Sequence, residues 1–198
     1  MSDVIKDGTG KGYTAKVDAQ GRLHTGSVSR IERDAAIADG RLFLMSSGIV
    51  TLTNAVETPV IYIKNTDARN LYMDIFFATT GTSTGGSGNF YTRSHVSLDA
   101  SSTIITEAKL AAVGNANTTS SNAFNGLVYY GETGDTFVNT VQFVTFIQQA
   151  GSSLETPISA ILQKGGDVAY TYQAPTGNTS MEVTVIVTAY YLDTELPD

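Results

Sequence analysis

The sequence of 198 residues has no cysteine and no tryptophan, only two histidines and four prolines, and few charged side chains. Without cysteine, the chain cannot form a disulfide framework, a thiol nucleophile, an iron–sulfur centre or a zinc site that uses thiolates. No window approaches the ~18 consecutive apolar residues of a membrane-spanning helix, and the first residues lack the basic and apolar regions of a secretory signal. We therefore expect a soluble chain that is made in a cytoplasm and has no membrane partner.

Positive charge is also scarce. Charged residues make up 16% of the chain, against about 25% in an average globular protein. The formal net charge is -7 and the sequence pI is about 4.7. Proteins that bind nucleic acids carry basic patches, so the sequence predicts no direct nucleic-acid partner.

The residue types that are abundant favour strands and turns. Serine and threonine together make up about a fifth of the chain, and glycine adds 19 residues. From residue 41 onward, short apolar runs alternate with turn clusters at the spacing of an antiparallel β-sandwich. We therefore predict an all-β body over residues 41–198 that ends in a short solvated tail. The expected strands are Leu42–Met45, Ile49–Leu52, Val60–Lys64, Leu71–Ala78, Phe90–His95, Thr103–Thr106, Gly126–Tyr130, Thr140–Gln148, Ile158–Gln163, Asp167–Tyr172 and Met181–Leu192.

The clearest strand signal lies near the C-terminus. Val183, Val185, Val187 and Ala189 alternate with mostly polar residues, which is a period of two. We expect these four side chains to be buried, and their burial to determine the register of the strand.

Residues 1–40 differ from the rest of the chain. They hold six of the twelve Lys and Arg residues and little apolar material, so they cannot form a core of their own. Residues 13–17 and 22–28 flank a turn at 18–21, which predicts a β-hairpin. A lone hairpin is marginally stable in water, so this N-terminal arm needs the following domain, a sister subunit or another protein to lie on. Residues 33–40 predict one or two helical turns ended by glycine, or a linker.

Two polar stretches, 79–88 and 114–122, read as exposed loop tips, and residues 107–112 predict a single short helix.

No arrangement of residues stands out as a catalytic or cofactor site. Residues 7–12 are rich in glycine but lack the spacing of a phosphate-binding loop. His24 and His95 are isolated, so no metal site is expected. Ser94 or Ser97 could be combined with His95 and Asp99, yet no nucleophile elbow surrounds either serine. We therefore predict no enzyme activity and no cofactor. A pair of carboxylates for glycoside hydrolysis stays open, because such partners meet only in the fold.

Aromatic side chains lie mainly in the expected strands. Core packing is the default for phenylalanine, whereas tyrosine also suits a subunit interface because its hydroxyl stays hydrogen-bonded there. Both uses stay open at this point.

Residues 5–29, with the sequence IKDGTGKGYTAKVDAQGRLHTGSVS, resemble the N-terminal segment of virion structural proteins of tailed bacteriophages. Such leaders precede β-rich domains in capsid decoration, head-fibre and tail-associated proteins. Residues 58–65 and 165–180 are similar, with lower specificity, to jelly-roll stretches of the same group. The resemblance implies an antiparallel jelly-roll-like β-sandwich with an N-terminal extended arm and β-hairpin, located in the virion.

The resemblance further implies a capsid decoration or cement protein that binds and stabilises the major capsid lattice. The body is expected to form a homo-oligomer, a trimer, and the arm to dock on the major capsid protein or another virion protein. The alternative is a tail or fibre component whose loops 79–88 and 114–122 contact host glycans, and a third class is a hydrolase of surface polysaccharide. The expected docking residues are Lys6, Lys11, Tyr13, Lys16, Arg22, His24 and Arg30.

Overall fold

The computed structural model describes residues 16–17, 23–24, 32–53, 55–81, 89–97, 109–131, 140–175, 177 and 181–192. The chain divides into two units, Met1–Ile31 and Glu32–Asp198. Residues 32–40, assigned to the arm from their sequence, therefore belong to the second unit. In the first unit, β1 (Lys16–Val17) and β2 (Leu23–His24) pair antiparallel, as a hairpin around residues 18–21 requires.

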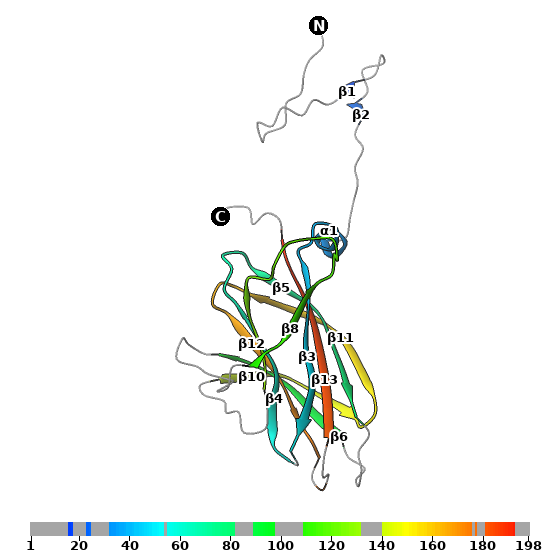
Figure 1. Cartoon of the computed structure of the whole chain (residues 1–198), viewed down its shortest axis with the longest axis vertical. Coiled ribbons are helices and arrows are strands. Elements are labelled where there is room, and N and C mark those ends of the chain that lie inside the picture. The colour runs from blue at the N-terminus through cyan, green and yellow to red at the C-terminus, as the bar shows by residue number, and fades with distance from the viewer. Residues whose placement is uncertain are drawn as a thin grey trace. The chain divides into compact units, whose positions relative to one another are not determined.

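The described residues of the second unit form two antiparallel sheets that pack as a sandwich (Figure 1). The prediction of an all-β sandwich is therefore confirmed. The five-stranded sheet has the order β11 (Ser153–Leu162), β5 (Leu71–Thr80), β13 (Met181–Tyr191), β3 (Leu42–Leu52) and β8 (Ala112–Asn115). The six-stranded sheet has the order β10 (Thr140–Gln149), β6 (Asn89–Ser97), β12 (Asp167–Gln173), β4 (Glu57–Asn65), β9 (Gly126–Tyr130) and β7 (Lys109–Leu110).

The strand connectivity is that of a jelly roll. Four strands in the first half of the body pair with four in the second half in reverse order, β3 with β13, β4 with β12, β5 with β11 and β6 with β10. Such a folded-over ribbon distributes its eight strands over two sheets. Strands β7, β8 and β9 lie in the connection between β6 and β10. They extend the two sheets beyond β3 and β4.

The core lies between the two sheets. In β13 the side chains of Val183, Val185, Val187 and Ala189 are buried, as predicted from their alternation. Burying each valine contributes about 1.5 to 3 kcal/mol, so a shift of one residue would expose the whole row to water. The largest buried aromatic side chains, among them Phe76 and Tyr172, fill the space between the sheets.

The two predicted strands 42–45 and 49–52 are a single strand. Between them the register with β13 shifts, because Ser47 and Gly48 together oppose Val185. Gly48 has a positive φ of 64°, and the Ser47 hydroxyl accepts a hydrogen bond of 3.0 Å from the Val185 amide. This β-bulge keeps the strand paired through a stretch that its sequence marks as a break.

The predicted helix at 107–112 is wrong where it can be compared. Residues 109–110 and 112–115 are strands β7 and β8, because pairing with β9 and β3 at the sheet edges outweighs the helix propensity of this alanine-rich stretch. Residues 107 and 108, like the expected strand 103–106, lie outside the described residues.

The predicted helical turns before residue 40 exist as α1 (Glu32–Ala38). Beyond it, the Gly40 amide donates to the Ile37 carbonyl and the Arg41 amide to the Ala36 carbonyl, with Gly40 at a φ of 66°. This is the Schellman arrangement that ends many helices at glycine. Within the part of the chain that the structure describes, no helix is long and apolar enough to cross a membrane.

Candidate functional site

The insertion between β6 and β10 contributes to two hollows in the surface of the body. Its described part, residues 109–131, crosses from one sheet to the other between β7 and β8, and the Ala111 amide donates to the Val128 carbonyl at 2.9 Å. Two hollows adjoin this insertion and share Phe43, Asn122 and Ala123 in their walls.

The first hollow is apolar and opens at the sandwich edge between β8 and β7. It has a volume of about 340 Å³, and no charged residue is among the described residues that line it. Phe43, Val113, Phe124 and Val128 form much of its wall, and Leu110, 75% exposed, is also part of the lining.

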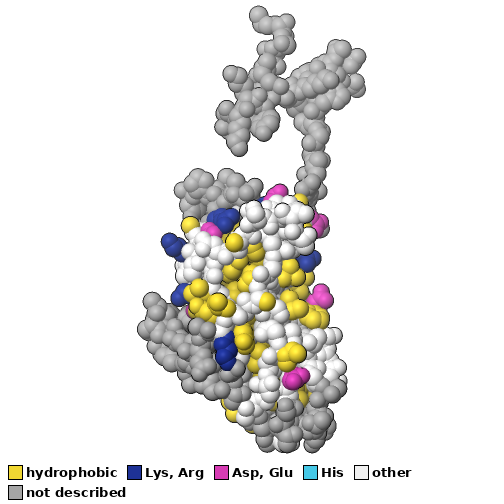
Figure 2. All heavy atoms as spheres, in the orientation of Figure 1, with side chains coloured by type: hydrophobic (Ala, Val, Ile, Leu, Met, Phe, Trp, Pro, Cys, Tyr) yellow, Lys and Arg dark blue, Asp and Glu magenta, His cyan; other side chains and the backbone are white. Residues whose placement is uncertain are grey.

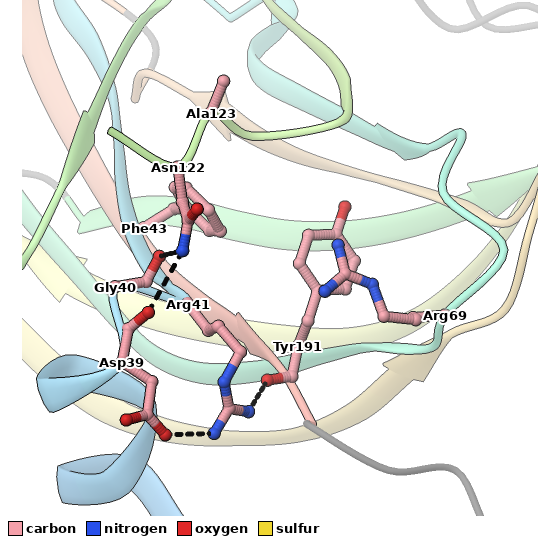
Figure 3. A pocket seen from close by; sticks show the side chains of 8 residues that line it. All are labelled: Asp39, Gly40, Arg41, Phe43, Arg69, Asn122, Ala123 and Tyr191. Atoms are coloured by element: carbon pink, nitrogen blue, oxygen red, sulfur yellow. Dashed lines mark hydrogen bonds and ion pairs between the residues drawn. The ribbon is translucent and has the colours of Figure 1, made fainter. Parts of the chain in front are cut away.

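The second hollow is polar, with a volume of about 290 Å³, and lies where the chain enters and leaves the body (Figure 3). Arg41 donates to the carbonyl of Tyr191 and pairs with Asp39 at 2.8 Å. Arg69 donates from Nε and a terminal nitrogen to the Asp67 carboxylate at 3.0 and 2.8 Å, and its guanidinium lies 4.5 Å from the centre of the Tyr191 ring. Because both arginines are engaged by carboxylates of the same chain, the hollow is not a preformed site for a further anion.

Asparagine side chains tie the insertion to the end of α1. The side-chain amide of Asn115 donates to the Gly40 carbonyl at 2.8 Å, and that of Asn117 donates to the Ala38 carbonyl at 2.9 Å. Asn122 donates to the Asp39 carbonyl at 3.1 Å. Residues 114–122, expected as an exposed loop tip, are thus anchored at several points, although Thr118 and Thr119 are exposed. In the other expected tip, residues 79–80 belong to β5 and 82–88 lie outside the described residues.

Beside the polar hollow, Asn65 at the end of β4 holds four chain segments together. It is fully buried, and its side-chain nitrogen donates to the carbonyls of Arg69 and Leu162, both at 2.8 Å. Its side-chain oxygen accepts from the Asp67 amide at 3.0 Å and from the Tyr191 hydroxyl at 3.3 Å. The side chain therefore uses all its hydrogen-bonding capacity inside the protein.

Asp67 is fixed by the same loop. Hydrogen bonds from the Arg69 side chain hold the pKa of the Asp67 carboxyl well below its usual range. Burial alone would raise this pKa, but hydrogen bonds from the Arg69 backbone amide and from Asn125 lower it further. The end of the sandwich is thus closed by a satisfied polar network.

A second polar group, away from this end, lies on β4, β6 and β12. Glu57 accepts hydrogen bonds from His95 at 2.8 Å and from the Thr171 hydroxyl at 2.6 Å, and Arg93 lies 3.3 Å away. The second ring nitrogen of His95 lies 3.4 Å from the Thr140 hydroxyl. Burial alone would raise the pKa of Glu57, but the hydrogen bonds and the Arg93 charge outweigh it and lower that pKa.

This group does not contain the serine arrangement weighed from the sequence. Ser94 is buried and neighbours His95 on β6, so the two side chains leave opposite faces of the strand. The Ser97 hydroxyl donates to Asp167 at 2.7 Å, and Asp99 lies outside the described residues. His95 instead takes Glu57 as its carboxylate partner. Among the described residues, no group of three or more His, Asp or Glu side chains could hold a metal ion.

The lowered pKa of Glu57 leads to a pH prediction. A carboxyl whose pKa is lower in the folded state stabilises the fold above its unfolded pKa, near 4.5, and this contribution is lost as the pH falls through the folded value. We expect Glu57→Gln to reduce the steepness with which unfolding free energy falls below pH ~4.5. Urea unfolding at several pH values measures this. Glu182→Gln, at an exposed position on β13, controls for the loss of one negative charge, and equal pH profiles for both variants would contradict the prediction.

The outer face of the five-stranded sheet is poor in charge. Figure 2 shows apolar side chains gathered over β3 and β13, with most charged groups toward the margins. Leu44 and Ile49 of β3 and Ile161 of β11 are exposed there. Helix α1 contacts β3 and β13, and Arg33, its second residue, pairs with Asp74 of β5 at 2.8 Å.

The structure describes only two of the predicted docking residues. Lys16 and His24 lie opposite each other in the pairing of β1 with β2. Lys6, Lys11, Tyr13, Arg22 and Arg30 lie outside the described residues. The two hollows and the Glu57 group were not predicted, because each combines residues from strands far apart in the sequence.

Comparisons with known proteins add little to this description of the chain. No family model matches the chain, and no curated protein matches it. A solved structure with a weak match is the subviral particle of VP2 from infectious bursal disease virus, at 8% sequence identity and a TM-score of 0.18. The match covers 77% of this chain and 41% of the VP2 chain, so this chain spans less than half of that protein. At this level the match is a faint likeness to a viral capsid protein and carries no functional argument.

Proposed function

We propose that this protein is a structural component of a tailed bacteriophage particle, a capsid decoration or cement protein that binds and stabilises the major capsid lattice. Residues 1–31 form the docking arm, which binds the capsid and holds the jelly-roll body on its surface. The protein acts as a homotrimer in the virion, and its work is adhesion rather than catalysis. The resemblance of residues 5–29 to phage virion leaders is the observation that carries this proposal.

The distribution of charge supports a docking arm. Residues 1–31 contain five Lys and Arg against three Asp, whereas residues 32–198 contain seven Lys and Arg against sixteen Asp and Glu. The arm therefore has a net charge of +2 and the body a net charge of -9. A positive arm is attracted to acidic or carbonyl-rich surfaces of an underlying protein, and this attraction weakens with salt.

The ends of the body also suit attachment from one side. The Tyr191 amide donates to the Arg41 carbonyl at 3.2 Å, so the body's first and last strands are joined where α1 precedes β3. Both chain segments outside the sandwich thus connect at the same end of the body, as Figure 1 shows for α1 and the end of β13.

The test uses particles prepared without this protein and the purified full chain. Reversing charge at Lys6, Lys11, Lys16 and Arg22 to Glu is expected to weaken co-sedimentation with particles at least about tenfold, roughly 1.4 kcal/mol or more. Lys164→Glu, at an exposed position of the body, is the control and should bind normally. Full binding by the charge-reversed chain would count against docking through the arm.

A cement role has a second consequence. Because a cement protein binds the assembled lattice and not the free subunits, it stabilises that lattice by mass action. Particles that lack the protein should release their DNA at a lower temperature, and adding the full chain should restore the original temperature. The alternative, a tail or fibre component, instead predicts that the protein binds host cells or glycans and does not change the temperature at which heads release DNA.

A further inference from the structure

The edge strand of the five-stranded sheet, β8, lacks the features that keep sheet edges from pairing. Natural edges are protected by charged side chains, prolines or bulges. The opposite edge, β11, has Glu155, Pro157 and a register shift after Pro157. Strand β8 consists of Ala112, Val113, Gly114 and Asn115, without charge or proline, and its register with β3 is regular.

The apolar hollow lies directly beside this edge. Its wall contains Phe43 and Phe124, whose rings pack at 5.5 Å, so it reaches the aromatic side of the core. A site for a small ligand presents a few convergent polar groups that orient the ligand. Here the side-chain nitrogens of Asn115 and Asn122 donate to backbone carbonyls of the same chain. The hollow therefore suits an apolar side chain better than a polar small molecule.

An apolar projection adjoins this hollow. Leu110 of β7 is part of the lining and is 75% exposed, and Val113 and Leu127 nearby are 39% and 38% exposed. With an exposed projection next to a hollow of matching chemistry, the projection of one copy can enter the hollow of the next, as in a head-to-tail contact between identical subunits. Buried apolar anchors in pockets supply much of the binding energy of protein interfaces.

Charge favours a second copy as the occupant. A body with a net charge of -9 repels its own copies over most of its surface. Among the described residues, neither the lining of the hollow nor strand β8 holds an acidic side chain, so two copies can approach there without opposing carboxylates from these residues.

We propose that the edge formed by β7 and β8 joins two copies of this chain, with Leu110 of one copy inserted into the apolar hollow of the next. This contact would be the interface of the homo-oligomer in the proposed function. Only its biological role rests on that function, since the contact itself is argued from the structure. It buries Leu110 and covers the unprotected edge of β8.

The first test measures self-association of the full chain by sedimentation velocity over a range of concentrations. Leu110→Asp is expected to raise the dissociation constant of the oligomer at least tenfold. Ile49→Asp is the matched control, because Ile49 is 70% exposed on β3 but lies outside the hollow. Equal thermal midpoints for the two variants establish that folding is intact. A monomeric full chain, or an oligomer that Leu110→Asp leaves unchanged, would overturn the proposal.

The second test uses the absence of cysteine in the chain. Full chains with Leu110→Cys and with Ala123→Cys, each carrying a different tag, are mixed and oxidised gently. A covalent pair containing both tags is expected, and the mixture of Ile49→Cys with Ala123→Cys should give far less. Equal yields would overturn the contact. Because neither test uses phage particles, failure of particle binding would contradict the proposed function and leave this result standing.

Discussion

Asn65→Ala is expected to lower the free energy of unfolding by about 3 to 4 kcal/mol, measured by urea denaturation of the full chain. The side chain is fully buried, and its loss leaves the carbonyls of Arg69 and Leu162 and the amide of Asp67 without the partners that it supplies. Each buried group left unsatisfied costs about 1 to 3 kcal/mol. The Tyr191 hydroxyl loses less, because it also donates to the Asn125 carbonyl at 3.0 Å.

Asn89→Ala is the matched control for this experiment. Asn89 begins β6 and is exposed, so the same chemical change there should stay within about 0.5 kcal/mol. If Asn65→Ala also cost less than about 1 kcal/mol, the network around Asn65 would not be what closes this end of the sandwich.

Gly40→Ala is expected to destabilise the body by about 2 to 5 kcal/mol, the sum of backbone strain and a steric clash. At a φ of 66°, a residue with a Cβ is strained by about 1 to 2 kcal/mol. The added Cβ would also lie 2.0 Å from the Ser120 hydroxyl oxygen and 2.4 Å from the Ser120 Cβ. Because the Ser120 Cβ is attached to the backbone, the loop must move and weaken the bonds from Asn117 and Asn122 to the end of α1.

Gly48→Ala separates the two contributions. Gly48 has nearly the same φ, 64°, but a Cβ there would meet nothing within 4 Å. It should therefore show the strain of about 1 to 2 kcal/mol alone. The difference in unfolding free energy between the two variants measures the clash with Ser120, and equal values would show that the loop does not press on Gly40.

Local patterns in the sequence were sufficient for much of the body. The alternation in β13 predicted which side chains are buried, and β9 was predicted with its observed ends, Gly126 and Tyr130. In both cases the signal lies within one strand. The bulge at Ser47 and Gly48 had no such signal, because it depends on the pairing partner Val185.

Local sequence patterns could not predict the polar contacts around Glu57 and Asn65, because these contacts also depend on residues far apart in the sequence. Glu57 and His95 are 38 residues apart, and Asn65 and Leu162 are 97 residues apart. Neither pair has a motif, since each is brought together by strand order. The asparagines of residues 114–122 look like loop formers in sequence, whereas in the fold they anchor the insertion to α1.

The order of residue types alone determined that this chain is rich in strands, that β13 buries one face, and that a positive arm precedes an acidic body. These properties depend on neighbours in sequence and on composition. Only the tertiary structure decided the jelly-roll pairing, the closed polar network at Asn65, and the edge of β7 and β8 with its apolar projection and hollow. Each of these features depends on contacts between residues that are far apart in the sequence. Such residues become neighbours only because their strands bury apolar side chains in one shared core.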